Sequence, residues 1–251
     1  MTTSKSALSS KLKIMKKTNT IWIYPLIALC FLLMLSISCK KKDNNSNPAP
    51  TTGTVTDIDG NVYHTVTIGT QVWMVENLKV THYRNGDPIA HIIDDTLWVN
   101  LTSGAFCNYN DDGVNGSTFG RLYNWYAIAE AHIISPVGWH IPSDAEWTTL
   151  TTYLGGESIA GGKLKENGTI HWNTPNTGAT NETGFTALPG GYRGFNDGTF
   201  YNIGNSGFWW SSTEGNASKA WSRFLSYSSS DIINGTKWKR FGFSVRCVRD
   251  F

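Results

Sequence analysis

The sequence lacks the short motifs that mark several large classes of enzyme. It holds no Gly-x-Ser-x-Gly elbow, no phosphate-binding loop and no paired histidines of the H-x-x-x-H type. The six histidines stand apart, at His64, His82, His91, His132, His140 and His171. These absences indicate a protein that is not an enzyme.

A net positive charge is also missing once the N-terminal segment is set aside. The full chain has 21 Lys and Arg against 19 Asp and Glu. Residues 1–38 contain five lysines and no acidic residue, so 21 − 5 = 16 basic residues face 19 acidic ones, a formal charge of −3. A nucleic-acid partner requires a basic footprint, so we expect none.

An uncharged apolar run, IWIYPLIALCFLLMLSI (Ile21–Ile37), follows Lys16 and Lys17. It is short for a membrane-spanning helix, which needs about 20 residues, and it ends just before Cys39. The pattern resembles a bacterial lipoprotein signal in a relaxed form. We predict a signal peptide over residues 1–38, with Met15 as an alternative start, and a lipid on Cys39 that inserts into the bilayer. An ordinary signal peptide or an anchor helix is the alternative.

Cysteine is scarce in the rest of the chain. Cys30 lies in the predicted signal and Cys39 at the lipid site, so only Cys107 and Cys247 remain. In an exported protein two such residues favour one disulfide. Closing a loop of about 140 residues is worth about 4–5 kcal/mol in the chain-entropy treatment. Two free thiols are the alternative.

The stretch DNNSNPAPTTG (residues 43–53) has no apolar face to bury. We therefore predict a disordered tether over residues 39–53. From residue 54 to residue 251 there is no further linker, charge run or repeat, which indicates a single domain.

Local patterns predict several elements of this domain. Asp59-Gly60 between Val- and Thr-rich runs predicts a hairpin, and the apolar spacing of residues 122–131 predicts a helix. In GWHIPSDAEW, Ser143 and Glu146 form the pattern of a capping box that begins a second helix. His140, beside Trp139, is interpreted as a hydrogen-bonded scaffold residue. Beyond Gly156 the chain reads as short strands between long Gly-, Asn- and aromatic-rich loops. Helices placed early and strands placed late indicate an α+β domain with two main helices.

One loop has the oxygen spacing of a calcium site. Asn108, Asn110 and Asp112 stand at the first, third and fifth positions before a glycine. The twelfth position is Phe119, where such loops carry a glutamate, and Asn/Asp/Gly runs are also ordinary loop chemistry. The sequence contains no other cofactor motif, and calcium at this loop stays an open alternative.

Tryptophan is abundant, with ten of the eleven residues beyond the predicted signal peptide. Aromatic faces suit sugar binding because they offer a large contact area at little entropic cost. Trp73, Trp125, Trp147 and Trp209 or Trp210 lie in regularly patterned segments and are expected in the core. The candidate ligand-binding residues lie in irregular polar loops: Trp98, Tyr109, Trp172, Tyr227 and Trp238. Packing under these loops is the alternative role.

The motifs DIDGNVYHTVTIGTQVWMVENL, GRLYNWYA, GWHIPSDAEW, TGFTALPGGYRG, WWSSTE and GFSVRCVRD occur in the order seen in the Fibrobacter succinogenes major paralogous domain family, which the chain resembles. This resemblance implies an exported, often lipid-anchored protein of undefined biochemical role. A fainter resemblance, to the formylglycine-generating enzyme and sulfatase-modifying factor group, implies a C-type-lectin-like fold whose first and last strands pair. The reactive cysteines of that group are missing, because no cysteine lies between Cys107 and Cys247.

The function we expect is therefore a non-catalytic binding module for a glycan or a protein at the cell surface. A structural or assembly component of the envelope, with no small-molecule ligand, is the alternative. The lipid would place the domain at the outer membrane, facing the periplasm or, the side we favour, the exterior.

Overall fold

A computed structural model describes residues 52–129 and 133–250. The predicted signal peptide, the lipid site Cys39 and most of the predicted tether lie outside these residues. The described residues belong to one compact unit, Pro48–Phe251. Its first strand begins at Thr52, two residues before the predicted start of the domain.

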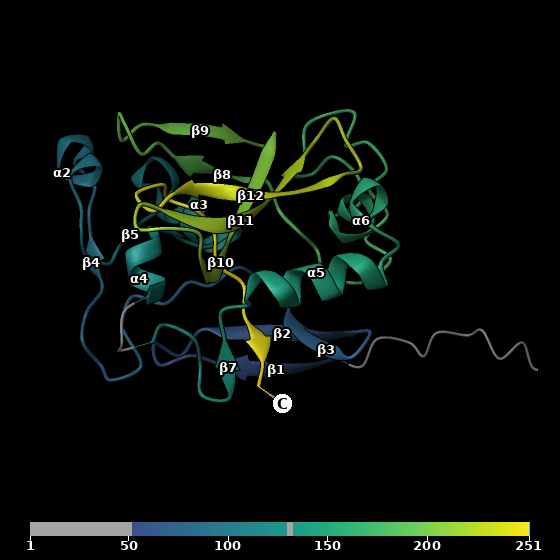
Figure 1. The fold of residues 1–251 in the computed structure, drawn as a ribbon, viewed down its shortest axis with the longest axis horizontal. Helices are drawn as coiled ribbons and strands as arrows, with labels where there is room; N and C mark the ends of the chain where they lie inside the picture. The colour runs from purple at the N-terminus through teal and green to yellow at the C-terminus, as the bar shows by residue number, and fades with distance from the viewer. Residues whose placement is uncertain (1–51, 130–132, 251) are drawn as a thin grey trace, which may run out of the picture. The chain divides into compact units, whose positions relative to one another are not determined.

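The first sheet has the strand order β1-β2-β3-β13-β7 and brings the two ends of the domain together (Figure 1). Its strands are β1 (Thr52–Thr56), β2 (Val62–Ile68), β3 (Gln71–Met74), β7 (Trp139–His140) and β13 (Val248–Arg249). The predicted hairpin is confirmed, because β1 and β2 pair antiparallel on either side of a turn. Asp57 closes the turn by accepting the backbone N–H groups of Asp59 and Asn61, and Gly60 adopts the positive φ of +83° that the turn needs.

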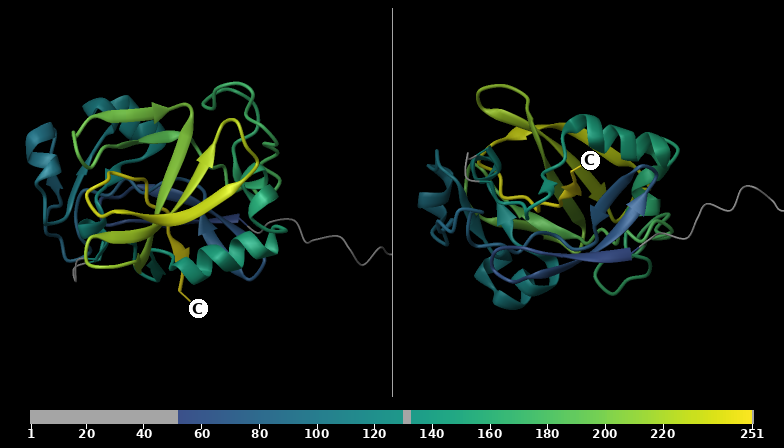
Figure 2. Two further views of the ribbon diagram at one scale, coloured as in Figure 1. Left: turned by 45° about the horizontal axis from the view of Figure 1, so that its top comes forward. Right: turned by 90° about the horizontal axis from the view of Figure 1, so that it is seen from below.

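The second sheet has the order β12-β11-β10-β8-β9 and lies above the first in the view of Figure 1. Its strands are β8 (Gly190–Arg193), β9 (Phe200–Ile203), β10 (Ser206–Glu214), β11 (Lys219–Ser226) and β12 (Ile232–Trp238). A small third sheet joins β4 (Ala90–His91), β5 (Ala105–Cys107) and β6 (Leu122–Tyr123). Figure 2 shows the second sheet from above on the left and the β1–β2 hairpin from below on the right.

The helices of the described residues are short. They are α2 (Asp95–Val99), the 3-10 turn η1 (Tyr109–Asp111), α3 (Gly113–Phe119), α4 (Trp125–Ala129), α5 (Asp144–Tyr153) and α6 (Glu157–Leu164). The two longest, α5 and α6, run for 10 and 8 residues. The mixture of helix and strand is the one predicted, and no helix in the described part of the chain is long and apolar enough to cross a bilayer.

The predicted capping box is confirmed at the start of α5. The Ser143 hydroxyl accepts the backbone N–H of Glu146, and the Glu146 carboxylate accepts the backbone N–H of Ser143 at 2.8 Å. The helix predicted from residue 122 begins instead at Trp125. The reason is tertiary, because Leu122 and Tyr123 pair with β5 as a strand.

Two hydrophobic clusters lie on opposite faces of the second sheet. Trp209 belongs to one with Trp73 and Trp147, whereas its neighbour Trp210 belongs to the other with Tyr123 and Phe243. Because side chains alternate along a strand, adjacent tryptophans of β10 serve both clusters. The expected burial of Trp73, Trp125, Trp147, Trp209 and Trp210 is confirmed.

The predicted disulfide is wrong in this structure, where Cys107 and Cys247 are both buried free thiols. Cys247 lies in the cluster of Trp210, whereas Cys107 lies in a third cluster with Trp98 and Leu122. Each thiol therefore packs as a small apolar group in its own part of the core.

Candidate functional site

Three of the five predicted ligand-binding aromatics are core residues. Trp98 and Trp172 are almost fully buried, and their indole N–H groups donate to the backbone oxygens of Arg240 (2.8 Å) and Ala187 (2.9 Å). Tyr109 is buried against Phe200, with ring centroids 5.2 Å apart. The prediction is wrong for these three residues, because each anchors a polar loop to the core and offers no ring face to a ligand.

The other two predicted residues reach the surface. Tyr227 is half-buried on the loop after β11 and packs against the cluster of Trp209. Trp238, at the end of β12, exposes 37% of its surface and stacks on Phe195 with an interplanar angle of 16°. The structure thus leaves Trp238 as the predicted residue with an open ring.

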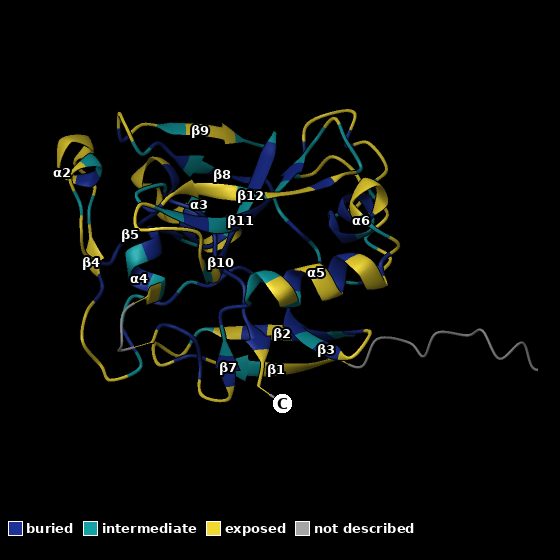
Figure 3. Cartoon of the chain, viewed as in Figure 1, coloured by how far each residue is buried: buried dark blue, intermediate teal, exposed yellow. Residues whose placement is uncertain are grey.

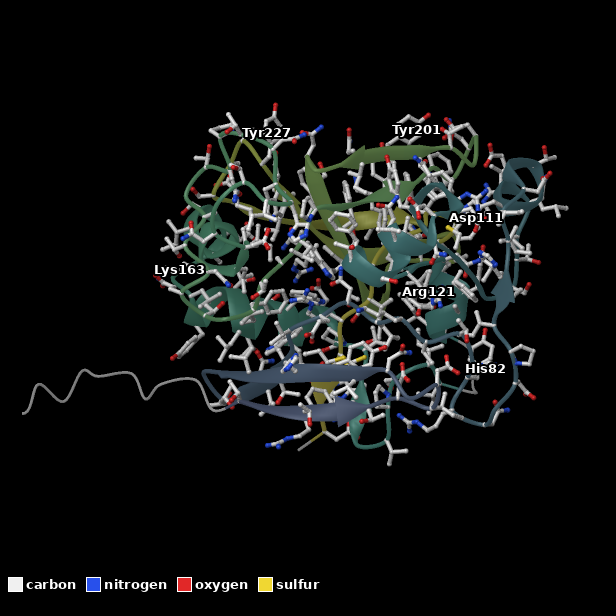
Figure 4. All side chains as sticks on the ribbon, turned by 180° about the vertical axis from the view of Figure 1, so that it is seen from behind. His82, Asp111, Arg121, Lys163, Tyr201 and Tyr227 are labelled. Carbon is white, nitrogen blue, oxygen red and sulfur yellow. The ribbon has the colours of Figure 1, made fainter. Side chains whose placement is uncertain are left out.

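Trp238 belongs to a continuous group of partly exposed rings that crosses the second sheet, here named the aromatic surface. All five strands of this sheet or the loops beside them contribute to it, and its members are Tyr192, Phe195, Tyr201, Phe208, Phe224, Trp238 and Phe241. Tyr201 is the second exposed ring, also at 37% (Figure 4). Figure 3 colours β12 and part of β9 as exposed and most of β10 as buried.

Ring contacts link Tyr201 to Trp238 without a break. Tyr201 stacks on Tyr192 at 5.3 Å, and Tyr192 meets Phe241 at 5.7 Å. Phe195 then lies 4.8 Å from Phe241 and 5.6 Å from Trp238. These separations are those of favourable aromatic pairs.

Buried residues hold the aromatic surface in place. Phe243, almost fully buried, packs at 4.8 Å from Phe208 and at 5.1 Å from Phe241. Phe208 and Phe224 are paired directly across β10 and β11, and Tyr192 and Tyr201 across β8 and β9. Strand register therefore fixes the rings, which gives a ligand a surface that needs little ordering.

Polar groups lie at the two exposed ends of the aromatic surface. The Tyr201 hydroxyl donates a short hydrogen bond to Asp197, and this bond lowers the pKa of the Asp197 carboxyl. At the other end the Lys219 ammonium lies over the Trp238 ring, 4.9 Å from its centroid, in a cation–π contact. A carboxylate and an ammonium beside open rings can bind hydroxyl groups of a ligand that stacks on them.

The residues of GWHIPSDAEW form a closed network. The two ring nitrogens of His140 bind Asp250 (2.6 Å) and Glu146 (2.7 Å), and Ser143 donates its hydroxyl to Glu146 at 2.8 Å. Burial opposes the charged ring, but hydrogen bonds to the two carboxylates outweigh it and raise the pKa of His140. With both nitrogens engaged, His140 has the arrangement of a scaffold residue and not that of a general base.

The predicted calcium loop is held by hydrogen bonds within the protein. Asp112 caps α3 by accepting the Val114 N–H, and the side-chain oxygen of Asn108 accepts from Arg121 at 2.9 Å. Asn110 lies in η1 with a positive φ of 53°. Across residues 52–129 and 133–250, no three His, Cys, Asp or Glu side chains are grouped as metal ligands. Two of the three predicted ligands are therefore engaged within the protein, Asn108 by Arg121 and Asp112 by the first turn of α3.

The aromatic surface was not predicted from the sequence as a whole, because only loop residues were considered as ligand contacts. A signal was present in the strands, where aromatic residues recur in GGYRGF, SGFWW and WSRF. Such residues are available to a ligand where the cluster beneath them leaves part of the ring exposed, as at Tyr201 and Trp238.

Comparison with known proteins identifies the family of this chain. Neither the curated proteins nor the solved structures include a match to this chain. The sequence profile of the Fibrobacter succinogenes major domain matches residues 66–249, which cover most of the folded unit and every strand of the second sheet. The chain belongs to the Fibrobacter succinogenes major domain family.

Proposed function

We propose that this domain is a non-catalytic binding module that holds glycans on the aromatic surface. The observation that carries the proposal is the unbroken series of ring contacts from Tyr201 to Trp238. The apolar face of a pyranose ring packs well on an aromatic ring, and the register-fixed strands pre-organise these rings.

The proposal includes a lipid anchor on Cys39 and display at the outer membrane, with the exterior favoured. The lipoprotein pattern at residues 36–39 supports the anchor, and the polar stretch after it, residues 40–53, would give the domain reach. A glycan-binding module benefits from such a tether because neighbouring copies can bind one polymer together.

A C-type-lectin-like architecture is the second part of the proposal. It is supported by the position of β13 in the same sheet as β1 and β2 and by the long segment between α6 and β8. One detail differs from the expectation, since β13 pairs with β3 and β7 and not with the first strand.

The test is a glycan array probed with the purified full chain in detergent, first with calcium and then with chelator. The proposal requires reproducible binding that chelation leaves unchanged, because no step depends on calcium. Binding that chelation abolishes would contradict the assignment to the aromatic surface and return attention to Asn108–Asp112. A blank array from folded protein would contradict glycan binding.

A structural or assembly role is the second candidate, and one observation favours it. Ile58 and Val137 are exposed and line a pocket of about 270 Å³ together with Asp57 and Arg84. Exposed apolar residues around a hollow suit a protein contact. Val137→Asp, at an 80% exposed position, should abolish cross-linking to an envelope partner and leave glycan binding unchanged, which would separate this role from glycan binding.

A further inference from the structure

A small polar hollow lies between α3 and the segment that follows β3. Its volume is about 140 Å³, enough for a tetrahedral oxyanion with water. Its polar lining comes from residues far apart in the sequence: Asn61, Lys79, Asn108, Ser117 and Arg121. In Figure 4 the labelled Arg121 marks this region.

The lining is cationic and contains no carboxylate. Lys79 and Arg121 form no ion pair within the described part of the chain. The acidic side chains around it are already engaged, since Asp57 accepts the side-chain amide of Asn61 at 2.8 Å and the Tyr63 hydroxyl at 2.6 Å, and Asp112 caps α3. The two positively charged side chains are therefore solvated in the hollow, and a bound anion would replace the water molecules at both of them.

Arg121 is oriented by the protein. Its Nε donates to the backbone oxygen of Lys79 at 2.6 Å, and Nη1 donates to the side chain of Asn108 at 2.9 Å. The guanidinium also packs over Phe106, 4.7 Å from the ring centroid. Nη2 makes no hydrogen bond to the described residues and is not sealed from solvent. A fixed guanidinium with a free amino group is a pre-organised donor for an oxyanion.

The Lys79 ammonium supplies the second charged donor, with three N–H groups. Two other polar groups of the lining already donate within the protein, the Ser117 hydroxyl to the backbone oxygen of Gly113 at 2.9 Å and the Asn61 amide to Asp57 at 2.8 Å. Gly116 keeps the hollow open beside Asn108, because a Cβ there would collide with the Asn108 side chain. The selection for an anion therefore comes from the two charged donors, Lys79 and Arg121.

We infer that this pocket binds a small oxyanion, namely sulfate, phosphate or carboxylate, either free or as the acidic group of a sugar. The inference stands on Lys79 and Arg121 and does not depend on the aromatic surface.

The experiment is a titration of the full chain in detergent with inorganic sulfate and with inorganic phosphate, followed by calorimetry and amide NMR. Chloride at matched ionic strength is the reference. A sulfated and an unsulfated form of one oligosaccharide then separate a free anion from an acidic sugar. Tighter binding of the sulfated form would show that the pocket binds the acidic group of a sugar. Equal binding of the two forms would show that the pocket binds the free anion.

Two variants probe the site and one serves as a control. Arg121→Gln and Lys79→Gln each remove one charge, and we expect each to weaken sulfate binding about tenfold. Arg249→Gln removes an exposed charge on β13 and should leave binding unchanged. Lys79→Gln leaves the hydrogen bonds of Arg121 to the protein in place. If Arg121→Gln fails to fold, the sulfate affinity of Lys79→Gln alone therefore tests the inference. Equal effects of sulfate and chloride, or equal affinities in all variants, would overturn the inference.

Discussion

Phe208 of β10 lies directly opposite Phe224 of β11, with ring centroids 4.7 Å apart and planes inclined by 26°. Beneath this pair the buried Phe243 stacks on Phe208 at 4.8 Å. A surface ring that is held from below and from the side cannot collapse when a ligand leaves. This arrangement distinguishes the aromatic surface from scattered exposed aromatics, which need no explanation.

Ser143→Ala is expected to lower the free energy of unfolding by about 1 kcal/mol, because the first turn of α5 loses its side-chain cap. Ligand affinity should not change, since Ser143 lies outside the aromatic surface. Chemical denaturation of both proteins measures the difference. Ser158→Ala, in the exposed first turn of α6, is the matched control and should change stability by less than about 0.5 kcal/mol. An unaltered midpoint for Ser143→Ala would refute the capping role.

The network of His140 predicts a stability that depends on pH. The pKa of His140 is raised above 6.5, so its contribution is complete below about pH 6.5 and is lost as the pH rises through the folded-state value. The pKa of Glu146 is lowered below 4.5 despite its burial, chiefly by hydrogen bonds from Ser143. Its contribution is present above about pH 4.5 and is lost as the pH falls through the folded-state value.

The two contributions therefore overlap between about pH 4.5 and pH 6.5. Thermal melts of the wild-type protein and of His140→Gln across this range and up to about pH 9 provide the measurement. The stability gap between them should be largest in the overlap and shrink toward alkaline pH. A gap that stays constant from acid to alkali would be incompatible with the two carboxylate bonds.

The third prediction concerns Lys165, whose ammonium group is fully buried and bound by carbonyl groups. Its Nζ donates to the backbone oxygens of Thr177, Ser226 and Ser229 at 2.8–2.9 Å. Lys165→Met leaves these oxygens without a donor and should lower the free energy of unfolding by about 3 kcal/mol.

Lys163→Met is the matched control for Lys165→Met. Lys163 forms a partly exposed ion pair with Glu182, which is worth about 0–1 kcal/mol. Denaturation curves of the two variants should therefore differ clearly. Equal losses would show that the buried ammonium adds nothing beyond a surface pair.

The two core cysteines predict a labelling pattern. Burial raises the pKa of Cys107 to about 12 and raises that of Cys247 as well. Both thiols should resist alkylation in the native protein and react in denaturant without prior reduction, as peptide mass mapping would reveal. Peptides joined through Cys107 and Cys247 would instead restore the disulfide that the structure lacks.

Local chemistry accounts for the elements that could be predicted. The Asp59-Gly60 turn and the Ser143–Glu146 capping box are complete within a few residues. Helix α6 was not predicted, because its sequence carries Gly161 and Gly162, which weaken helix formation. The structure gives the reason for both: a Cβ on either would collide with backbone carbonyls of Asp231 or Gly178.

The candidate site was harder to predict because it also depends on contacts between segments far apart in the sequence. Trp98 and Trp172 lie in polar stretches, and only the folded chain shows that these loops turn inward to bury them. Conversely, Phe208 and Phe224 have the composition of core strands, and their partial exposure depends on how far Phe243 and its neighbours cover them. Local patterns do not determine which side of a ring is covered by distant segments.

The most direct test of glycan binding compares three single variants against the strongest glycan found on the array. Trp238→Ala and Tyr201→Ala remove the two open rings of the aromatic surface, and each should weaken binding about tenfold, or about 1.4 kcal/mol. Tyr153→Ala removes a ring of similar exposure, 48%, on α5 and should leave the affinity unchanged. Unchanged affinity in both Trp238→Ala and Tyr201→Ala, with the fold intact, would contradict the account.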